Sequence, residues 1–336
     1  MEVFYPSYYK SFACIAAACP DSCCKEWEVD VDDISAARYR GLTGPLGDAL
    51  RRVLKDNEDG TVMTIHNGRC PMWREDGLCR IQAELGHEAL CKTCQEFPRL
   101  RHDYGSFVEL GLELSCPEAA RLILTQQATW EKENVAGDGT ADYEEEAMQV
   151  LRRSREVVLQ YLRSSTTPIN QKLAVILLYG HHVQSWLDGG EEAYFDESAF
   201  LQLSSRYAQK GEWEPILNFF QNLEILTQQW KERLTSPKPV KSWANGQIAL
   251  TEYFILRYWL QAVSDYDLIG RVKMIVVSCL LIHYLGGDFI ATAQLYSKEI
   301  ENDVDNVEAI LDGAYTSPAL TDENLLSLLL NDEKIL

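Results

Sequence analysis

Residues 14–24 read CIAAACPDSCC, and this stretch decides how the rest of the chain is interpreted. Its four cysteines have the spacing C-x4-C-x3-C-C, and five more follow in the spacing C-x8-C-x11-C-x2-C-x21-C. After residue 116 there is one further cysteine, Cys279, in the apolar string VVSCLLI, where we expect a helix core. A hydrophobic core does not need such a density of thiols, whereas a metal, an iron–sulfur cluster or disulfides do. The nine clustered residues are Cys14, Cys19, Cys23, Cys24, Cys70, Cys79, Cys91, Cys94 and Cys116.

Length and charge limit the possible functions. The 336 residues suit two modest domains or one domain with a large extension, and 46% are hydrophobic. A net charge of -20 argues against nucleic acid and anionic membrane surfaces as primary partners. The start, MEVFYPSYYK, lacks the pattern of a signal peptide, and the apolar run 274–282 is shorter than the ~20 residues of a membrane span. We therefore expect a cytoplasmic protein, and a reducing compartment disfavours disulfides.

Periodicity predicts an α+β fold that is mainly α. Alternating apolar residues predict strands at 28–31, 61–66 and 107–114, and Asn67-Gly68 predicts a tight turn. A short helix is expected at 81–91, and Pro117 suits the first turn of another. Helical spacing predicts further helices at 148–164, 173–187, 216–234, 249–264, 271–285, 288–301 and 322–331. The predicted organisation is a cysteine-rich metal- or cluster-binding domain at 1–130, an acidic linker at 131–147 and an all-α domain at 148–336.

The residue types favour a soft metal, because thiolates bind zinc and iron. Neighbouring residues such as Cys23 and Cys24 cannot easily form a disulfide, and their side chains point opposite ways in an extended segment. Only Cys91-x2-Cys94 looks like a zinc knuckle, while a four-cysteine iron–sulfur cluster needs no regular spacing. Spacing alone therefore leaves zinc and iron–sulfur both open.

Five short segments together resemble the flagellin lysine-N-methylase family (FliB), and the order of the cysteines resembles the wider YkgJ-like cysteine-rich domain. All five fall between residues 12 and 122, and the helical half has no signature of its own. The segments are Phe12-x-Cys14, Ala18-Cys19-Pro20-Asp21-Ser22-Cys23-Cys24-x2-Trp27-x-Val29, Cys79-Arg80-Ile81-Gln82, Thr93-Cys94-Gln95-x-Phe97-Pro98-Arg99 and Leu114-Ser115-Cys116-Pro117-Glu118-Ala119-Ala120-Arg121.

The resemblance implies a [4Fe–4S] cluster and methyl transfer from S-adenosylmethionine to lysine amines of flagellin. The chain has neither a G-x-G-x-x-G motif nor the C-x3-C-x2-C triad, so the sequence does not show how the methyl donor is held. The preferred metal ligands are Cys19, Cys23, Cys24, Cys70, Cys79, Cys94 and Cys116, with Cys14 and Cys91 ranked lower.

The implied chemistry also suggests roles for four charged residues. Glu113 and Glu118 flank Cys116 and are the candidate catalytic carboxylates, since a lysine must lose its proton before it attacks. Arg99 and Arg121 are candidates for holding the carboxylate of S-adenosylmethionine. A structural salt bridge is the simpler interpretation of each arginine, and a favourable first-turn charge is the simpler one for Glu118.

Two other functions stay open at this stage. One is a zinc-stabilised binding or scaffold protein without chemistry, and the other is an iron–sulfur redox protein. For the methylase, the expected partner is flagellin or another lysine-rich protein, whose charge would complement an acidic surface.

Overall fold

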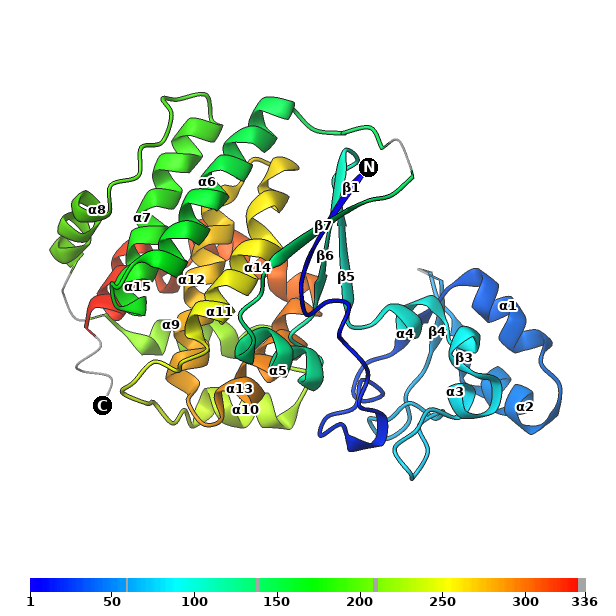
Figure 1. Ribbon diagram of the computed structural model, residues 1–336. Coiled ribbons are helices and arrows are strands. Elements are labelled where there is room, and N and C mark those ends of the chain that lie inside the picture. The colour runs from blue at the N-terminus through cyan, green and yellow to red at the C-terminus, as the bar shows by residue number, and fades with distance from the viewer. Residues whose placement is uncertain (59, 137–138, 208–210, 332–336) are drawn as a thin grey trace.

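The computed structural model describes residues 1–336 except 59, 137–138, 208–210 and 332–336. It consists of a large, mostly helical body and a smaller lobe, with a sheet between them (Figure 1). The predicted fold class, mainly α with few strands, is confirmed. Whether the first 130 residues form a cysteine-rich metal domain stays a prediction.

The large body is built around one long apolar helix. This is α12 (Leu268–Leu285), which packs against α7 (Ile169–Leu187), α11 (Gln247–Tyr258) and α14 (Val304–Thr316). Its length and composition would suit a membrane span, but 94% of it is buried inside the protein. The other helices are α5 (Pro117–Thr125), α6 (Glu145–Ser164), α8 (Glu197–Ser204), α9 (Trp213–Gln221), α10 (Gln228–Thr235), α13 (Phe289–Tyr296) and α15 (Asp322–Leu330).

A four-stranded sheet lies between the helical body and the lobe. Its order is β5 (Arg99–Asp103), β6 (Phe107–Leu112), β1 (Glu2–Pro6) and β7 (Trp130–Asn134). Strand β1 runs parallel to β6, with Val3 opposite Val108, and antiparallel to β7. Strand β1 at the N-terminus thus pairs with strands that lie more than a hundred residues later in the chain. The sheet therefore holds the two ends of residues 1–134 next to each other.

The lobe has a small sheet and a core of its own. The sheet order is β2 (Val29–Val31), β4 (Thr61–Met63) and β3 (Leu54–Asp56). Around it lie α1 (Asp33–Gly41), α2 (Gly44–Val53), α3 (Arg80–Leu85) and α4 (Lys92–Glu96). Tyr39, Leu50 and Met72 are buried at its centre, together with Cys91. Asn67 and Gly68 form the expected tight turn with positive φ, closed by hydrogen bonds between His66 and Arg69.

Two details of the predicted organisation differ from the structure. The expected linker at 131–147 begins with β7 and ends with the first turn of α6, while residues 137–138 lie outside the described residues. The core of the helical body also extends back across residue 130. It includes Tyr8, Phe12 and Leu114. Apolar residues scattered over short strands carry no helical period, so the sequence pattern did not reveal that they join this core. Residues 208–210 and 332–336 of the expected helical domain are likewise outside the described residues.

Gly180 tests the packing of the helical body, because it lies where α7 meets α12. A Cβ atom there would lie 3.0 Å from Cγ1 of Val272. Gly180→Ala should lower the free energy of unfolding by about 1–2 kcal/mol, since overpacking outweighs the gain in helix propensity. Gly41 is the control, because a Cβ there meets no atom within 4 Å. Urea denaturation of both variants measures this, and equal effects would contradict the close packing.

Candidate functional site

The nine N-terminal cysteines gather where the lobe meets the helical body, and all are free thiols. The Cys24 side chain is hydrogen-bonded to those of Cys23 and Cys70, and Cys91 is bonded to Cys94. The remaining thiols interact electrostatically with these. Cys79 interacts with Cys24 and Cys91, Cys94 with Cys23 and Cys24, and Cys14 and Cys116 with Cys23, while Cys19 interacts with Cys14. Pairwise interactions therefore link the predicted ligands to one another and to Cys14 and Cys91, while the ligand assignment itself stays a prediction.

Hydrogen bonds between thiols separate their pKa values. Bonds from Cys23 and Cys70 lower the pKa of Cys24 to about 3, and the same bonds raise the pKa values of the two donors. A bond from Cys94 lowers the pKa of Cys91 to about 7. Burial raises the pKa of Cys116 to about 11. Thiolate character therefore concentrates at Cys24 and Cys91, and thiolate is the form that binds a metal.

The donor chemistry fits a soft metal, but the ligand geometry is not closed. Across the described residues, no three or more histidine, cysteine, aspartate or glutamate side chains stand in an arrangement ready to hold an ion. Thiols linked by such pairwise interactions are nevertheless the donor type that zinc or an iron–sulfur cluster selects. A metal would thus bind by drawing four of these thiols together.

One buried lysine fastens the first cysteine loop to the helical body. Lys298 is 3% exposed, and its Nζ lies 3.1 Å from Oδ2 of Asp21 and 2.5 Å from Oε2 of Glu26. Burial alone would lower the pKa of Lys298, but the two carboxylates outweigh it and raise that pKa. Gln294 adds hydrogen bonds to Asp21 Oδ2, at 3.1 Å, and to the Ser115 carbonyl, at 2.8 Å. The loop that carries Cys19, Cys23 and Cys24 is therefore held against α13 and the turn that continues this helix.

Lys298 belongs to a π-helical turn, Ser297–Glu301, that continues α13. All five of its residues are buried. Such turns are rare in proteins overall, but those that occur are frequently found at functional sites. Here the turn aims Lys298 at the cysteine loop, while Glu299 and Glu301 line an adjacent cavity.

This cavity, called here the thiol cavity, lies between the lobe and the π-helical turn and has a volume of about 410 Å³. Cys23 and Cys94 line it, as do the aromatic rings of Trp27 and Phe97. Lys298 is its one basic lining residue among the described residues. The lining carboxylates are Glu28, Asp30, Glu113, Glu224, Glu299, Glu301 and Asp303. A cavity with this surplus of negative charge favours a cationic ligand.

Glu113 is the predicted catalytic carboxylate that the structure places in this cavity. Burial raises its pKa, which the nearby guanidinium of Arg257 partly opposes. Its Oε2 accepts a hydrogen bond of 3.1 Å from Ser115. Glu301 lies beyond it in a buried network, paired with Arg257 at 3.1 Å and bonded by the hydroxyl of Tyr253 at 3.0 Å. Glu113 is thus a carboxylate of raised basicity that faces a cation-binding space.

The other three charged candidates do not line the thiol cavity. Glu118 and Arg121 pair with each other at 2.6 Å on the first turn of α5, where Arg121 is half-exposed. This pairing supports a structural salt bridge as the role of Arg121 and a favourable first-turn charge as the role of Glu118. The guanidinium of Arg99 lies 5.3 Å from the ring centroid of Phe12, at the exposed edge strand β5. The structure brings together Glu113 and the cysteines, and leaves these three apart.

Sequence reasoning missed the contribution of the helical half. The stretch YSKEIE, which contains Lys298, Glu299 and Glu301, has the pattern of an ordinary helix. This pattern does not indicate a π-helical turn. Cys91 was ranked low although its C-x2-C spacing with Cys94 was the available signal. It precedes α4, so its thiol comes within hydrogen-bonding reach of Cys94 one turn later.

The ion pairs of Lys298 with Asp21 and Glu26, called here the lysine clamp, can be tested directly. Lys298→Met should lower the free energy of unfolding by roughly 2 kcal/mol, because it leaves two partly buried carboxylates without a partner. Release of the loop should also speed alkylation of Cys23 by iodoacetamide in reduced, metal-depleted protein, followed by peptide mass spectrometry. Arg101→Met is the control, since its pair with Asp103 is about half exposed on both sides. Unchanged stability and thiol reactivity in Lys298→Met would contradict the clamp.

Comparison with known proteins identifies relatives that match part of the chain. The chain is 34% identical over 131 residues to the flagellar biosynthetic protein FliU of Salmonella muenchen, covering 37% of this chain and 78% of that protein. It is equally identical to the lysine-N-methylases of Salmonella choleraesuis and Salmonella typhimurium, where the match spans only 33% of each. No protein-family model and no solved structure matches. On its likeness to FliU and to these methylases, the chain belongs to the flagellin lysine-N-methylase family.

Proposed function

We propose that this protein transfers a methyl group from S-adenosylmethionine to lysine side chains of a flagellar protein. The names of its relatives support protein-lysine methylation and a flagellar substrate. The observation that carries the proposal is the thiol cavity, an acidic and aromatic-lined space next to a group of nine thiols. Its charge suits a lysine side chain, which arrives as an ammonium ion.

The cavity offers each feature that a lysine acceptor needs. Its carboxylates attract the ammonium group, and Trp27 and Phe97 can flank the aliphatic stem. Glu113 takes the proton from the amine, because burial has raised its basicity. The nitrogen lone pair then forms a bond to the methyl carbon as the sulfur–carbon bond breaks. The sulfonium donor leaves as a neutral thioether, and the proton remains on Glu113.

The thiols would hold the metal, for which a [4Fe–4S] cluster is the first proposal and zinc the alternative. Cys23, Cys70, Cys79 and Cys94 interact with Cys24, the most thiolate-like sulfur, while Cys116 interacts with Cys23, and Cys19 with Cys116. A cluster bound there would cross-link the lobe to the body and add a redox centre beside the cavity. The lysine clamp would keep the Cys23 loop in reach of it.

Partner and location follow from charge and from the relatives. A flagellar protein with exposed lysines is attracted by a chain of net charge -20, and the attraction weakens as salt shortens the Debye length. Nucleic acid and membrane surfaces carry the wrong sign of charge. Such a substrate is available before export, so we propose that the protein acts in the cytoplasm.

Metal content separates the rival functions. Protein purified without oxygen should be brown, with visible absorption that dithionite bleaches. Cys24→Ser should lose most of the iron and sulfide, because its thiol bonds to two others. Cys279→Ser should retain them, since that thiol is buried in α12 beside Thr251. Colourless protein with stoichiometric zinc would favour the scaffold alternative, and full iron content in Cys24→Ser would contradict the ligand assignment.

Intact-mass spectrometry tests the activity. With S-adenosylmethionine and flagellin, the substrate should gain about 14 Da for each lysine methyl group. Glu113→Gln should lower kcat by roughly a hundredfold, as loss of a general base does. The wild-type rate should fall as the pH drops through the raised pKa of Glu113, above its usual 4.5, because protonation removes the base. Glu118→Gln, which alters a carboxylate already paired with Arg121, is the control.

Absence of methylation by metal-loaded protein across several flagellins would reject the methylase and leave the redox protein as the better candidate. Methylation that is insensitive to Glu113→Gln would keep the function and move the base elsewhere.

A further inference from the structure

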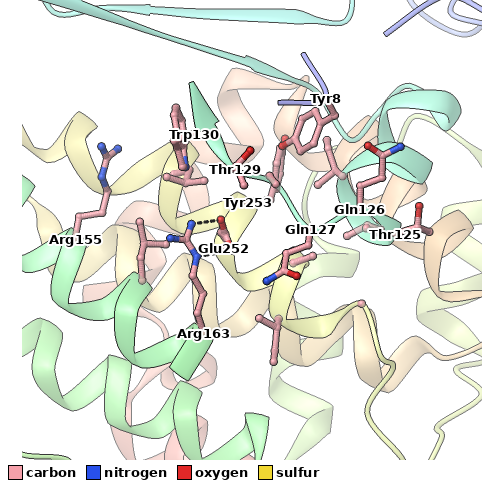
Figure 2. A pocket seen from close by; sticks show the side chains of 18 of the residues that line it. Tyr8, Thr125, Gln126, Gln127, Thr129, Trp130, Arg155, Arg163, Glu252 and Tyr253 are labelled. Atoms are coloured by element: carbon pink, nitrogen blue, oxygen red, sulfur yellow. Dashed lines mark hydrogen bonds and ion pairs between the residues drawn. The ribbon is translucent and has the colours of Figure 1, made fainter. Parts of the chain in front are cut away.

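A second cavity, called here the β7 cavity, is lined by the four-stranded sheet and by the helices α6 and α11. It has a volume of about 860 Å³, and the segment 125–130, which leads from α5 into β7, forms one wall. Figure 2 shows Tyr8, Thr129 and Trp130 around this cavity, with Arg155 and Arg163 on α6. The chemistry proposed for the thiol cavity does not use this space.

Strand β7 borders the β7 cavity with an unpaired edge. It is the last strand in the sheet order, and its partner is β1. The bond from the Ser7 N–H to the Thr129 carbonyl shows that the odd-numbered residues of this segment bond to β1. Because the direction of bonding alternates along a strand, the backbone N–H and C=O groups of Trp130, Lys132 and Asn134 face outward. Among the described residues, no hydrogen bond is formed by these outward-facing groups.

The charges on β7 select against a second copy of the chain. If two β7 strands paired symmetrically about Lys132, each Glu131 would face a Glu133 and the two lysines would face each other. Like charges directly opposite each other destabilise a strand pair. Lys132 pairs with Glu2, and Glu133 pairs with Lys10. Glu131 is exposed and, in the part of the chain that the structure describes, forms no ion pair, so it favours a partner strand with a basic side chain opposite.

The lining of the β7 cavity is neutral as a whole. Arg155 and Arg163 each form a two-point ion pair with a glutamate, and Figure 2 draws the second pair with dashed lines. Arg152 and Glu156, of opposite charge, lie one turn apart on α6, where the guanidinium of Arg152 lies 4.7 Å from the ring centroid of Phe107. The six charges therefore cancel, and the cavity favours uncharged side chains. The charged lining residues are Arg152, Arg155, Arg163, Glu109, Glu156 and Glu252.

Tyr8 gives the cavity wall a polar group without a protein partner. Its side chain is 7% exposed, and it lines the β7 cavity (Figure 2). Among the described residues, no hydrogen bond is formed by its hydroxyl. Burial raises the pKa of Tyr8, so the phenol keeps its proton to donate. A hydroxyl held there without a partner costs stability, which a bound polypeptide would restore by accepting its hydrogen bond.

We propose that β7 binds an extended segment of the substrate protein as an added strand, in which uncharged side chains alternate with basic ones. Its main chain bonds to the outward-facing groups of β7. Every second side chain enters the β7 cavity, on the face of the sheet where Lys132 lies over the ring of Phe4. The basic side chains lie on the other face, beside Glu131, which is opposite Tyr5 in the register. The flagellar origin of the segment rests on the proposed function, whereas its chemistry follows from β7 and the cavity.

The test is hydrogen–deuterium exchange of the full-length protein, followed by mass spectrometry, with a synthetic peptide of alternating threonine and lysine. The fragment that contains β7 should exchange more slowly with the peptide bound, because the outward N–H groups become hydrogen-bonded. The fragment that contains β5, the opposite edge strand, should not change. A peptide of alternating threonine and glutamate should protect neither. Absence of protection at β7, or equal protection at both edges, would overturn the proposal.

Two variants with matched controls locate the binding. Lys132→Pro removes an outward N–H and should weaken peptide binding roughly tenfold. Arg101→Pro should bind normally, because Arg101 faces outward on β5 and likewise loses one exposed ion pair. Glu131→Lys should also weaken binding roughly tenfold, whereas Glu191→Lys, between α7 and α8, makes the same change in net charge without effect. Equal loss in a variant and its control would contradict the site, and Glu131→Lys decides the matter if Lys132→Pro does not fold.

Flagellin separates this docking surface from the proposed function. Monomeric flagellin should protect β7 as the peptide does. Protection by the peptide but not by flagellin would keep the docking surface and contradict the flagellar substrate. Methylation of flagellin without protection of β7 would keep the proposed function and overturn the docking surface. Protection that appears with rising protein concentration alone would show that β7 pairs with a second copy, which also overturns it.

Discussion

The ion pairs of Lys298 with Asp21 and Glu26 are the constraint on which the site depends. An ammonium group that is 3% exposed is stable only while its carboxylates stay with it, so the first cysteine loop cannot leave the helical body without a large cost. The same π-helical turn supplies Glu301 to the thiol cavity. Cysteine loop, cavity and helical core are therefore positioned together, although they come from opposite ends of the chain.

Local signals in the sequence predicted a good part of the fold. The turn at Asn67-Gly68 formed because both residues tolerate positive φ, and Pro117 begins α5 as expected of a proline in a first turn. The predicted helix at 271–285 is the core of α12, and the one at 216–234 divides into α9 and α10. Each successful prediction rested on residues close together in the chain, where periodicity and turn chemistry act directly.

Features that depend on distant residues were beyond that reasoning. Strand β7 lies in the expected linker because β1, more than a hundred residues earlier, pairs with it. Clustering in the sequence grouped all nine thiols, but Cys91 was ranked below the preferred ligands although its side chain bonds to that of Cys94. The role of Lys298 follows from burial against Asp21, which no local pattern encodes. Glu118 and Glu113 both flank Cys116, yet one meets Arg121 on a helix surface and the other a buried cavity.

Charge determines what the thiol cavity can hold. Its lining has an excess of carboxylates, and Lys298, its one basic lining residue among the described residues, is already paired with Asp21 and Glu26. A cation is therefore attracted to this cavity. The hydroxyl of Tyr253 links two of the buried groups beside it, since it donates a hydrogen bond to Glu301 and accepts one, at 2.9 Å, from Arg257. Because the charge of Arg257 also acts on Glu113, a change at either carboxylate acts on the same buried network.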